Sequence, residues 1–348
     1  MVDPADVDPS LKYSINAWGI QPLPTPRKAI ALLAKPVSKV LEHYRMIAGC
    51  AIDGSDAEYA TVDSPASARQ LIVIVLRFPD EPTASVVASK IDSTDSELNS
   101  ANVAVSVDGY PNAHAHWRPG LPTMAASIAH GPYVVSLLLR NQTADQQALT
   151  GLARTAFDKQ LPMLDHFSAT PEDRFQSLPL DQDGMLRRLV PYAPNRWPYP
   201  AVVAFSNTTD ATLSQEGSVN PFGLVFEGRA ARLWYRVTYD TGVDAIAENN
   251  FTQLYRHFDT VKARKHFNTM LQKLISNTAQ QRLPDIPGAD DTACFSNPSL
   301  QDYAQYSAPY TCITLYGRYI GILLGRDKVN TQHRIAAQYG LLMNTDSE

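Results

Sequence analysis

One phrase occurs twice in the chain, and this repetition restricts the fold more than any other feature of the sequence. Residues 130–141 read HGPYVVSLLLRN, and residues 316–327 read YGRYIGILLGRD. When the two phrases are aligned at a constant spacing, Gly131 corresponds to Gly317, Tyr133 to Tyr319 and Arg140 to Arg326. Each phrase is apolar enough for a strand and runs into a helix-like stretch. We infer a duplicated unit in which each phrase forms the last strand before the last helix. Chance is the alternative, because an apolar strand before a helix is common.

The length of the chain agrees with two units. Its 348 residues are many for one hydrophobic core, whereas two cores of about 150 residues each are ordinary. The hydrophobic fraction of 44% and the charged fraction of 19% are typical of a folded protein and exclude a disordered chain. We therefore expect two globular lobes.

Both halves show the same order of expected elements: a strand, a helix, further strands, the Gly-x-Tyr strand and a final helix. In the first half, residues 69–78 (RQLIVIVLRF) are apolar almost throughout, which predicts a strand that is covered on both faces or is at least central in its sheet. The order as a whole predicts an α+β fold of two tandem ferredoxin-like lobes. Each lobe would be an antiparallel sheet with helices on one face.

Changes in periodicity and composition predict the boundaries. Residues 1–68 are expected to form an N-terminal arm and helix that pack on the body, and residues 69–167 the first lobe. Residues 168–198, which are dense in Pro, Asp and Arg, are expected to form the connector, and residues 199–348 the second lobe.

Within the second lobe, two segments have a clear pattern. Alternation over residues 231–240 (ARLWYRVTYD) predicts a strand. Residues 244–275 predict a long helical stretch, either continuous or broken into two. His257 and His266 would then lie on its basic face, which is either solvated or in contact with acidic lipid or a partner.

The chain carries none of the short signatures of common enzymes. It lacks G-x-S-x-G, H-E-x-x-H, G-x-x-x-x-G-K-[ST] and G-x-G-x-x-G. This favours a non-catalytic protein without excluding catalysis. The net charge of -5 argues against a nucleic-acid binder, which needs a basic face. No apolar run reaches the roughly 18 residues of a membrane span.

The cysteines, 3 in number, separate into a pair and a single residue. Cys294 and Cys312 lie on either side of a loop rich in Ser, Asn, Pro and Tyr. A disulfide between them would contribute about 3 kcal/mol through chain entropy and would indicate an oxidising compartment. Two reduced structural thiols are the alternative. Cys50 is expected to be a small buried residue, and no C-x-x-C spacing supports a zinc or redox motif.

The segment YPNAHAHW is the one local group of side chains that suits a ligand. His114 and His116 are two positions apart, so on a strand both imidazoles point to one face. With His130 from the next strand they could bind a divalent metal, or one of them could ligate haem. Tyr110 and Trp117 complete the candidate ligand-binding residues. The alternative is that these histidines flank a surface turn and hydrogen bond to backbone or solvent.

Six phrases, in order along most of the chain, carry a family resemblance. They are LPTPRKA from Leu23, VLEHYRM from Val40, AHGPYVV from Ala129, TACFS from Thr292, YGRYIGILLGRD from Tyr316 and HRIAAQYGLL from His333. Together they resemble a family of extracytoplasmic lipoproteins of mycobacteria, nocardiae and related actinobacteria that carries the domain of unknown function 7373. The resemblance implies tethering by a lipidated cysteine to the outer face of the plasma membrane, with this chain starting just after that cysteine. It brings no catalytic residues, and it agrees with pairing of Cys294 and Cys312 outside the cytoplasm.

These observations favour a non-catalytic cell-envelope domain that binds a partner protein or an apolar small ligand between its two lobes. No cofactor is expected in that case. The alternative is a haem- or metal-binding protein, including a haem-dependent enzyme, that uses His114 and His116. It depends on the histidine pair and on an analogy between folds. Elemental analysis and a haem titration would separate the two readings.

Overall fold

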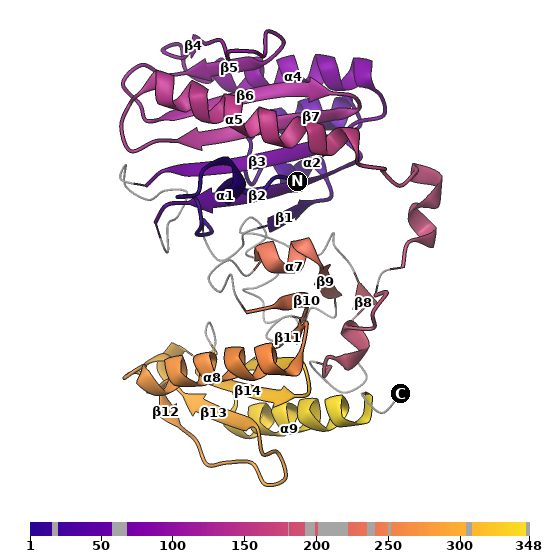
Figure 1. The fold of residues 1–348 in the computed structure, drawn as a ribbon, viewed down its shortest axis with the longest axis vertical. Helices are drawn as coiled ribbons and strands as arrows, with labels where there is room; N and C mark the ends of the chain where they lie inside the picture. Colours follow the sequence, from indigo (N-terminus) through magenta and orange to yellow (C-terminus); the bar gives the residue numbers. More distant parts are fainter. Residues whose placement is uncertain are drawn as a thin grey trace. The chain divides into compact units, whose positions relative to one another are not determined.

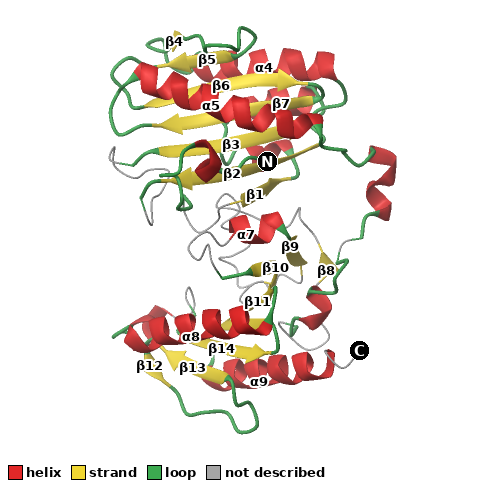
Figure 2. Ribbon diagram, in the orientation of Figure 1, coloured by secondary structure: helices red, strands yellow, loops and turns green. Residues whose placement is uncertain are grey.

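The structure, a computed structural model, describes residues 1–15, 20–57, 68–179, 181–191, 199–200, 222–234, 241–249, 252–303 and 308–345. The chain forms two compact units. The first contains Met1–Asp173, and most of the second lies beyond Arg174. Each unit is a mainly antiparallel sheet with helices (Figures 1 and 2). The predicted α+β fold of two lobes is therefore confirmed.

The first lobe holds a 7-stranded sheet in the order β1-β2-β3-β7-β6-β5-β4. Its strands are β1 (Ile20–Leu23), β2 (Ala48–Ser55), β3 (Gln70–Arg77), β4 (Val103–Ala104), β5 (His114–Trp117), β6 (Thr123–His130) and β7 (Tyr133–Arg140). Its helices are α1 (Pro4–Val7), α2 (Pro26–Ala29), α3 (Val37–His43), α4 (Glu81–Ser96) and α5 (Gln146–Asp165). Residues 1–68 thus add β1 and β2 to the sheet, in addition to α1, α2 and α3.

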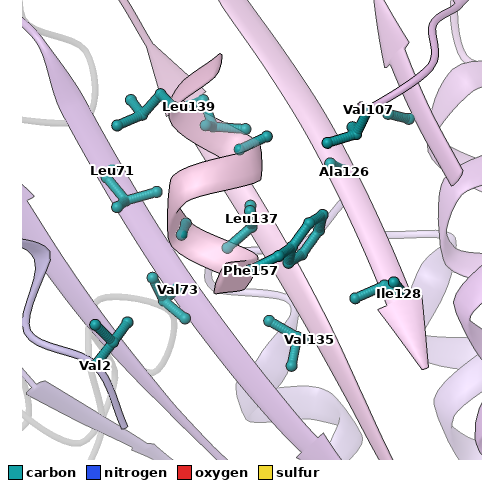
Figure 3. Close-up of a cluster of buried hydrophobic side chains, with 14 of the residues drawn as sticks. Val2, Leu71, Val73, Val107, Ala126, Ile128, Val135, Leu137, Leu139 and Phe157 are labelled. Carbon is teal, nitrogen blue, oxygen red and sulfur yellow. The ribbon is translucent and has the colours of Figure 1, made fainter. Parts of the chain in front are cut away.

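Strand β3 explains why helices cover both faces of the first sheet. Leu71 and Val73 pack with Phe157 of α5 (Figure 3), whereas Ile72 and Ile74 pack in a second cluster with α4. Successive side chains of a strand point to opposite faces, so an uninterrupted apolar strand needs cover on both. The prediction of cover on both faces is confirmed. The expectation of helices on one face is wrong for this lobe, because α4 and α5 lie on opposite faces.

The second lobe holds an 8-stranded sheet in the order β12-β13-β14-β15-β11-β10-β9-β8. Its strands are β8 (Tyr199–Pro200), β9 (Phe222–Glu227), β10 (Val243–Asn249), β11 (Thr252–His257), β12 (Gln281–Arg282), β13 (Thr292–Ser296), β14 (Tyr310–Tyr316) and β15 (Tyr319–Gly325). Its helices are α7 (Arg229–Trp234), α8 (Thr260–Ser276) and α9 (Lys328–Thr345), and short 3-10 helices include η2 (Leu186–Arg188) and η5 (Pro298–Tyr303).

The two lobes repeat one order of elements. The series β3, α4, β5, β6, β7 and α5 corresponds to β11, α8, β13, β14, β15 and α9, and both sheets arrange the corresponding strands in the same order. Tyr133 opens β7 opposite Arg77 of β3. Tyr319 opens β15 opposite Arg256 of β11. The repeated phrase therefore occupies the same strand of both lobes, with Arg140 closing β7 and Arg326 following β15.

Each repeated phrase also forms the same tight turn. Gly131-Pro132 and Gly317-Arg318 are two-residue hairpin loops. Gly131 has a φ of 52° and Gly317 a φ of 54°. A type II′ turn needs a positive φ at its first central residue, where glycine carries no steric cost, and its twist matches that of the flanking strands. The glycines of the phrase are thus explained by backbone geometry.

The second lobe differs from the sequence prediction in two segments. The strand expected over residues 231–240 is replaced up to Trp234 by α7, and the rest of that segment lies outside the described residues. The helix expected over residues 244–275 consists of β10, β11 and α8. Ala245 and Ala247 favour a helix by intrinsic propensity. Pairing of β10 with β9 and β11 buries both in a sheet instead, because tertiary pairing outweighs propensity.

Candidate ligand-binding pocket

A cavity of about 380 Å³ lies at one end of the first sheet. It is open to one side and is lined by the C-terminal end of α4 and the loop after it, by the end of β5 and the turn that follows, and by the adjoining ends of β3, β6 and β7. The positions of these elements can be followed in Figure 1. Its apolar walls include Ile72, Leu98, Leu121, Ala125 and Leu138, and its polar walls include Gln70, Asp95, Asn102, His116, Arg118 and Arg140. Apolar walls with a few polar groups are typical of small-molecule sites.

His116 joins β5 to α4 on one side of the cavity. Its Nδ1 lies 2.8 Å from Oδ1 of Asp92, and its Nε2 lies 3.6 Å from Oδ2 of Asp95. The two carboxylates are three positions apart on α4 and therefore lie on one face of the helix. Burial raises the pKa of Asp95, an effect that the positive charge of a protonated His116 opposes. Both ring nitrogens thus face a carboxylate, which fixes the imidazole and leaves it few further contacts to make.

Arg118 lies in the turn after β5, where local hydrogen bonds fix the backbone. The indole Nε1–H of Trp117 donates to the carbonyl of Leu121 at 2.7 Å, and the amide of Leu121 donates to the carbonyl of Arg118 at 3.0 Å. Gly120 supplies the positive φ of 84° that this turn needs. The guanidinium Nε–H of Arg118 donates to Oδ1 of Asn102 at 3.3 Å. Within the described part of the chain, no carboxylate forms an ion pair with Arg118.

The remaining polar wall comes from two central strands. Gln70 of β3 and Arg140 of β7 stand directly opposite each other in the sheet. Gln70 is buried, at 5% exposure. Both residues line the cavity, so polar side chains reach it from the sheet as well as from the turn after β5.

The candidate residues from the sequence do not gather in one place. His116 and Trp117 line the cavity. Tyr110 lies elsewhere, where its hydroxyl donates to Asp158 of α5 at 2.6 Å, and burial followed by this hydrogen bond raises the pKa of Tyr110 to about 12. His114 is paired in register with Ser127 of β6.

The structure also corrects the expectation that His130 completes a set of ligands with the histidine pair. His130 lies on the α5 face of β6, with Nε2 at 2.6 Å from Oδ1 of Asp165. His116 lies on the opposite face, because it contacts Asp92 of α4, and His114 shares that face through its two-residue spacing. On β6, the odd-numbered positions Ala125 and Ser127 pair with His116 and His114 and share their face of the sheet. His130 is an even-numbered position and therefore lies on the other face. Among the described residues, no three His, Cys, Asp or Glu side chains are placed to hold a metal ion.

The predicted pairing of Cys294 with Cys312 is confirmed, whereas the expectation that Cys50 is a buried residue is not. Cys294 and Cys312 form a disulfide between facing positions of β13 and β14, with their Cα atoms 4.1 Å apart. Both residues are buried. Cys50 is the free cysteine. It is only partly buried as a residue, and burial of its thiol raises the pKa to about 11.

A second polar cluster, which sequence reasoning misplaced, lies in the second lobe. His257 ends β11 and His266 lies on α8, and both are buried rather than solvated. Nε2 of His257 and Nδ1 of His266 are 2.9 Å apart, so one neutral imidazole donates to the other. Burial lowers the pKa of His257 to about 4 and that of His266 to about 3. The ring of Tyr255 stacks on His266 with 6.1 Å between centroids.

Comparison with models of protein families shows to which family the chain belongs. The N-terminal model of a domain of unknown function (DUF7373) matches residues 1–180, and the C-terminal model matches residues 185–345. The chain belongs to the DUF7373 family. The two DUF7373 models meet just before η2, close to the point where the compact units divide.

Other comparisons add little to the DUF7373 assignment. Among solved structures, the crystal structure of the extracellular domain of PknH from Mycobacterium tuberculosis is similar at 14% identity. The similarity covers 42% of this chain and 79% of that chain, with a TM-score of 0.27, which does not establish a common fold. No curated protein sequence matches the chain. In the part of this DUF7373 chain that the structure describes, no helix has the length and apolar character needed to cross a membrane.

Proposed function

We propose that this chain is a non-catalytic domain of the cell envelope that binds a small apolar ligand in the cavity of its first lobe. The observation that carries the proposal is the open cavity of about 380 Å³, whose lining combines apolar side chains with a similar number of polar and charged ones. The sequence alone suggested a site between the lobes. The first lobe forms an open cavity from its own residues, and we therefore place the ligand there.

The proposed location is extracytoplasmic. A disulfide between two buried cysteines supports this, because disulfides persist in oxidising compartments. From the resemblance to actinobacterial lipoproteins we propose that a lipidated cysteine holds the native protein at the outer face of the plasma membrane, where an envelope protein would be its partner. Metabolic labelling of the full-length protein with an alkyne fatty acid tests the anchor. We expect the label to be lost when the cysteine that this resemblance implies is replaced by serine. An unlabelled wild-type protein would disprove the lipid anchor.

Binding of a neutral fluorescent probe, N-phenyl-1-naphthylamine, tests the cavity. Saturable enhancement of fluorescence is expected with the intact chain. Ala125→Phe should abolish it, because Ala125 lines the cavity beside His116 and a phenyl ring would occupy the space. Ala144→Phe is the matched control, because Ala144 is exposed in the loop before α5. Equal binding by both variants, with both folded by circular dichroism, would refute the site.

The alternative function, a haem- or metal-binding protein that uses His114 and His116, makes a separate set of predictions. It requires a Soret shift on titration with haem, or bound metal by elemental analysis, and loss of that signal in His116→Ala. The carboxylates of Asp92 and Asp95 beside both ring nitrogens of His116 favour a structural role for this histidine. We therefore place the ligand site in the cavity as a whole.

A further inference from the structure

We infer that the cavity selects an amphipathic ligand with an anionic head group of the carboxylate class, and that Arg118 receives this head group. The inference deepens the proposed function and rests on it. It depends on the charged side chains that line the cavity and on the groups with which each of them already interacts.

The acidic side chain of the cavity already has a partner. Asp95 lies 3.6 Å from His116, and His116 also contacts Asp92 at 2.8 Å. The positive charge of a protonated His116 offsets the negative charge of the Asp95 carboxylate, which then attracts a ligand cation less strongly than a carboxylate alone would. Asp95 is therefore a poor receptor for a positively charged head group.

The guanidinium of Arg118, in the turn after β5, has more N–H donors than the side-chain hydrogen bonds it forms with the described residues. A guanidinium carries five N–H donors, and among the described residues the one side-chain hydrogen bond of Arg118 runs to a neutral carboxamide, that of Asn102, at the long distance of 3.3 Å. Arg118 is half-buried, so its charge is screened less than that of a fully exposed arginine. A planar guanidinium suits a carboxylate, which can accept two parallel hydrogen bonds.

The geometry also provides a place for the apolar part of such a ligand. Leu98 is 57% exposed and Leu121 is 37% exposed, and both line the cavity together with Ile72 and Leu138. Leu121 belongs to the same turn as Arg118, since its amide donates to the Arg118 carbonyl. One ligand could therefore place an apolar chain against the leucines and an anionic group at Arg118.

Three probes with the same tail and different heads test the head-group preference: decanoate, decanol and decyltrimethylammonium. Each would be titrated into the full chain to displace N-phenyl-1-naphthylamine. We expect decanoate to bind about tenfold or more tightly than decanol, which corresponds to one charge-assisted hydrogen-bonded contact. Arg118→Gln should remove this preference, and Arg118→Lys should keep part of it.

The control is Arg154→Gln, because Arg154 is an exposed residue of α5 on the opposite face of the sheet. It should retain the full preference for decanoate. Equal binding of decanoate and decanol, tighter binding of the cationic probe, or a preference that survives Arg118→Gln would each overturn the inference and leave the proposed cavity in place. Failure of all three probes to displace the dye would overturn both.

Discussion

Removal of the Cys294–Cys312 disulfide should destabilise the second lobe by about 3 kcal/mol. The bridge joins residues 18 apart in sequence, and for a loop of that size the chain-entropy model gives about 3 kcal/mol from restriction of the unfolded state. Replacing both cysteines by alanine also deletes buried sulfur atoms, so the loss in this variant should be at least that large.

Hydrogen exchange measured by mass spectrometry gives the change for each lobe separately. Peptides that cover β14 and β15 should exchange about a hundredfold faster in Cys294→Ala/Cys312→Ala, since every 1.4 kcal/mol changes an equilibrium about tenfold. Peptides from β3 and β7 of the first lobe should be unaffected. Cys50→Ala serves as the control because it removes a thiol without removing a bridge. Unchanged exchange in the second lobe, or equal acceleration in both lobes, would refute the reasoning.

Two further predictions concern the second lobe. Because burial lowers the pKa of His257 to about 4 and of His266 to about 3, the unfolded chain, with histidine pKa values near 6.5, takes up protons first. The contribution of both histidines to stability is therefore complete above about pH 6.5 and is lost as the pH falls toward 4, by up to about 1.4 kcal/mol per pH unit for each histidine. Urea unfolding at several pH values should show that the free energy of unfolding depends less on pH in His266→Phe than in the wild type. The same pH dependence in both proteins would contradict this. Gly317→Ala should cost about 1 kcal/mol because its φ is 54°, whereas Gly340→Ala, within α9 and with open space at its Cβ position, should stabilise by about 1 kcal/mol. Denaturation midpoints of Gly317→Ala and Gly340→Ala that move in the same direction would contradict this prediction.

The parts of the fold that local sequence determines could be predicted. Strand β3 is apolar at successive positions, which requires cover on both faces wherever it lies. The repeated Gly-x-Tyr phrase predicted matching strands in two lobes, and Gly131 and Gly317 occupy the same position of the same turn. The pairing of Cys294 with Cys312 could be proposed from a loop between two apolar runs, which form β13 and β14.

The elements that were missed depend on their neighbours. Strand β2 reads AGCAIDGS, which is rich in small residues of low strand propensity. It is a strand because β1 and β3 pair with its two edges, and Gly49 allows Leu76 of β3 to approach closely. Strand β10 is similar, since its alanines predict a helix until β9 and β11 are known to lie beside it.

The candidate site could be predicted only in part. The segment YPNAHAHW drew attention to His116 and Trp117, which do line the cavity, although the expected chemistry was metal or haem binding. Arg118 follows directly in the sequence, but nothing local indicates that Leu98 and Arg140 come to lie around the same space. The cavity arises where α4 meets the ends of β5, β6 and β7, and this requires long-range packing that no short pattern reports.

The most direct test of the central claim, that the first lobe binds its ligand in this cavity, is the nitrogen-proton NMR spectrum of the tryptophan indoles. The chain has 4 tryptophans, and Trp117 can be assigned by Trp117→Phe. It lines the cavity, and its indole donates to Leu121 at 2.7 Å. Titration with decanoate and with decanol should shift the Trp117 resonance in a saturable way and leave the others in place. A Trp117 resonance that does not move while another indole signal shifts would contradict the account.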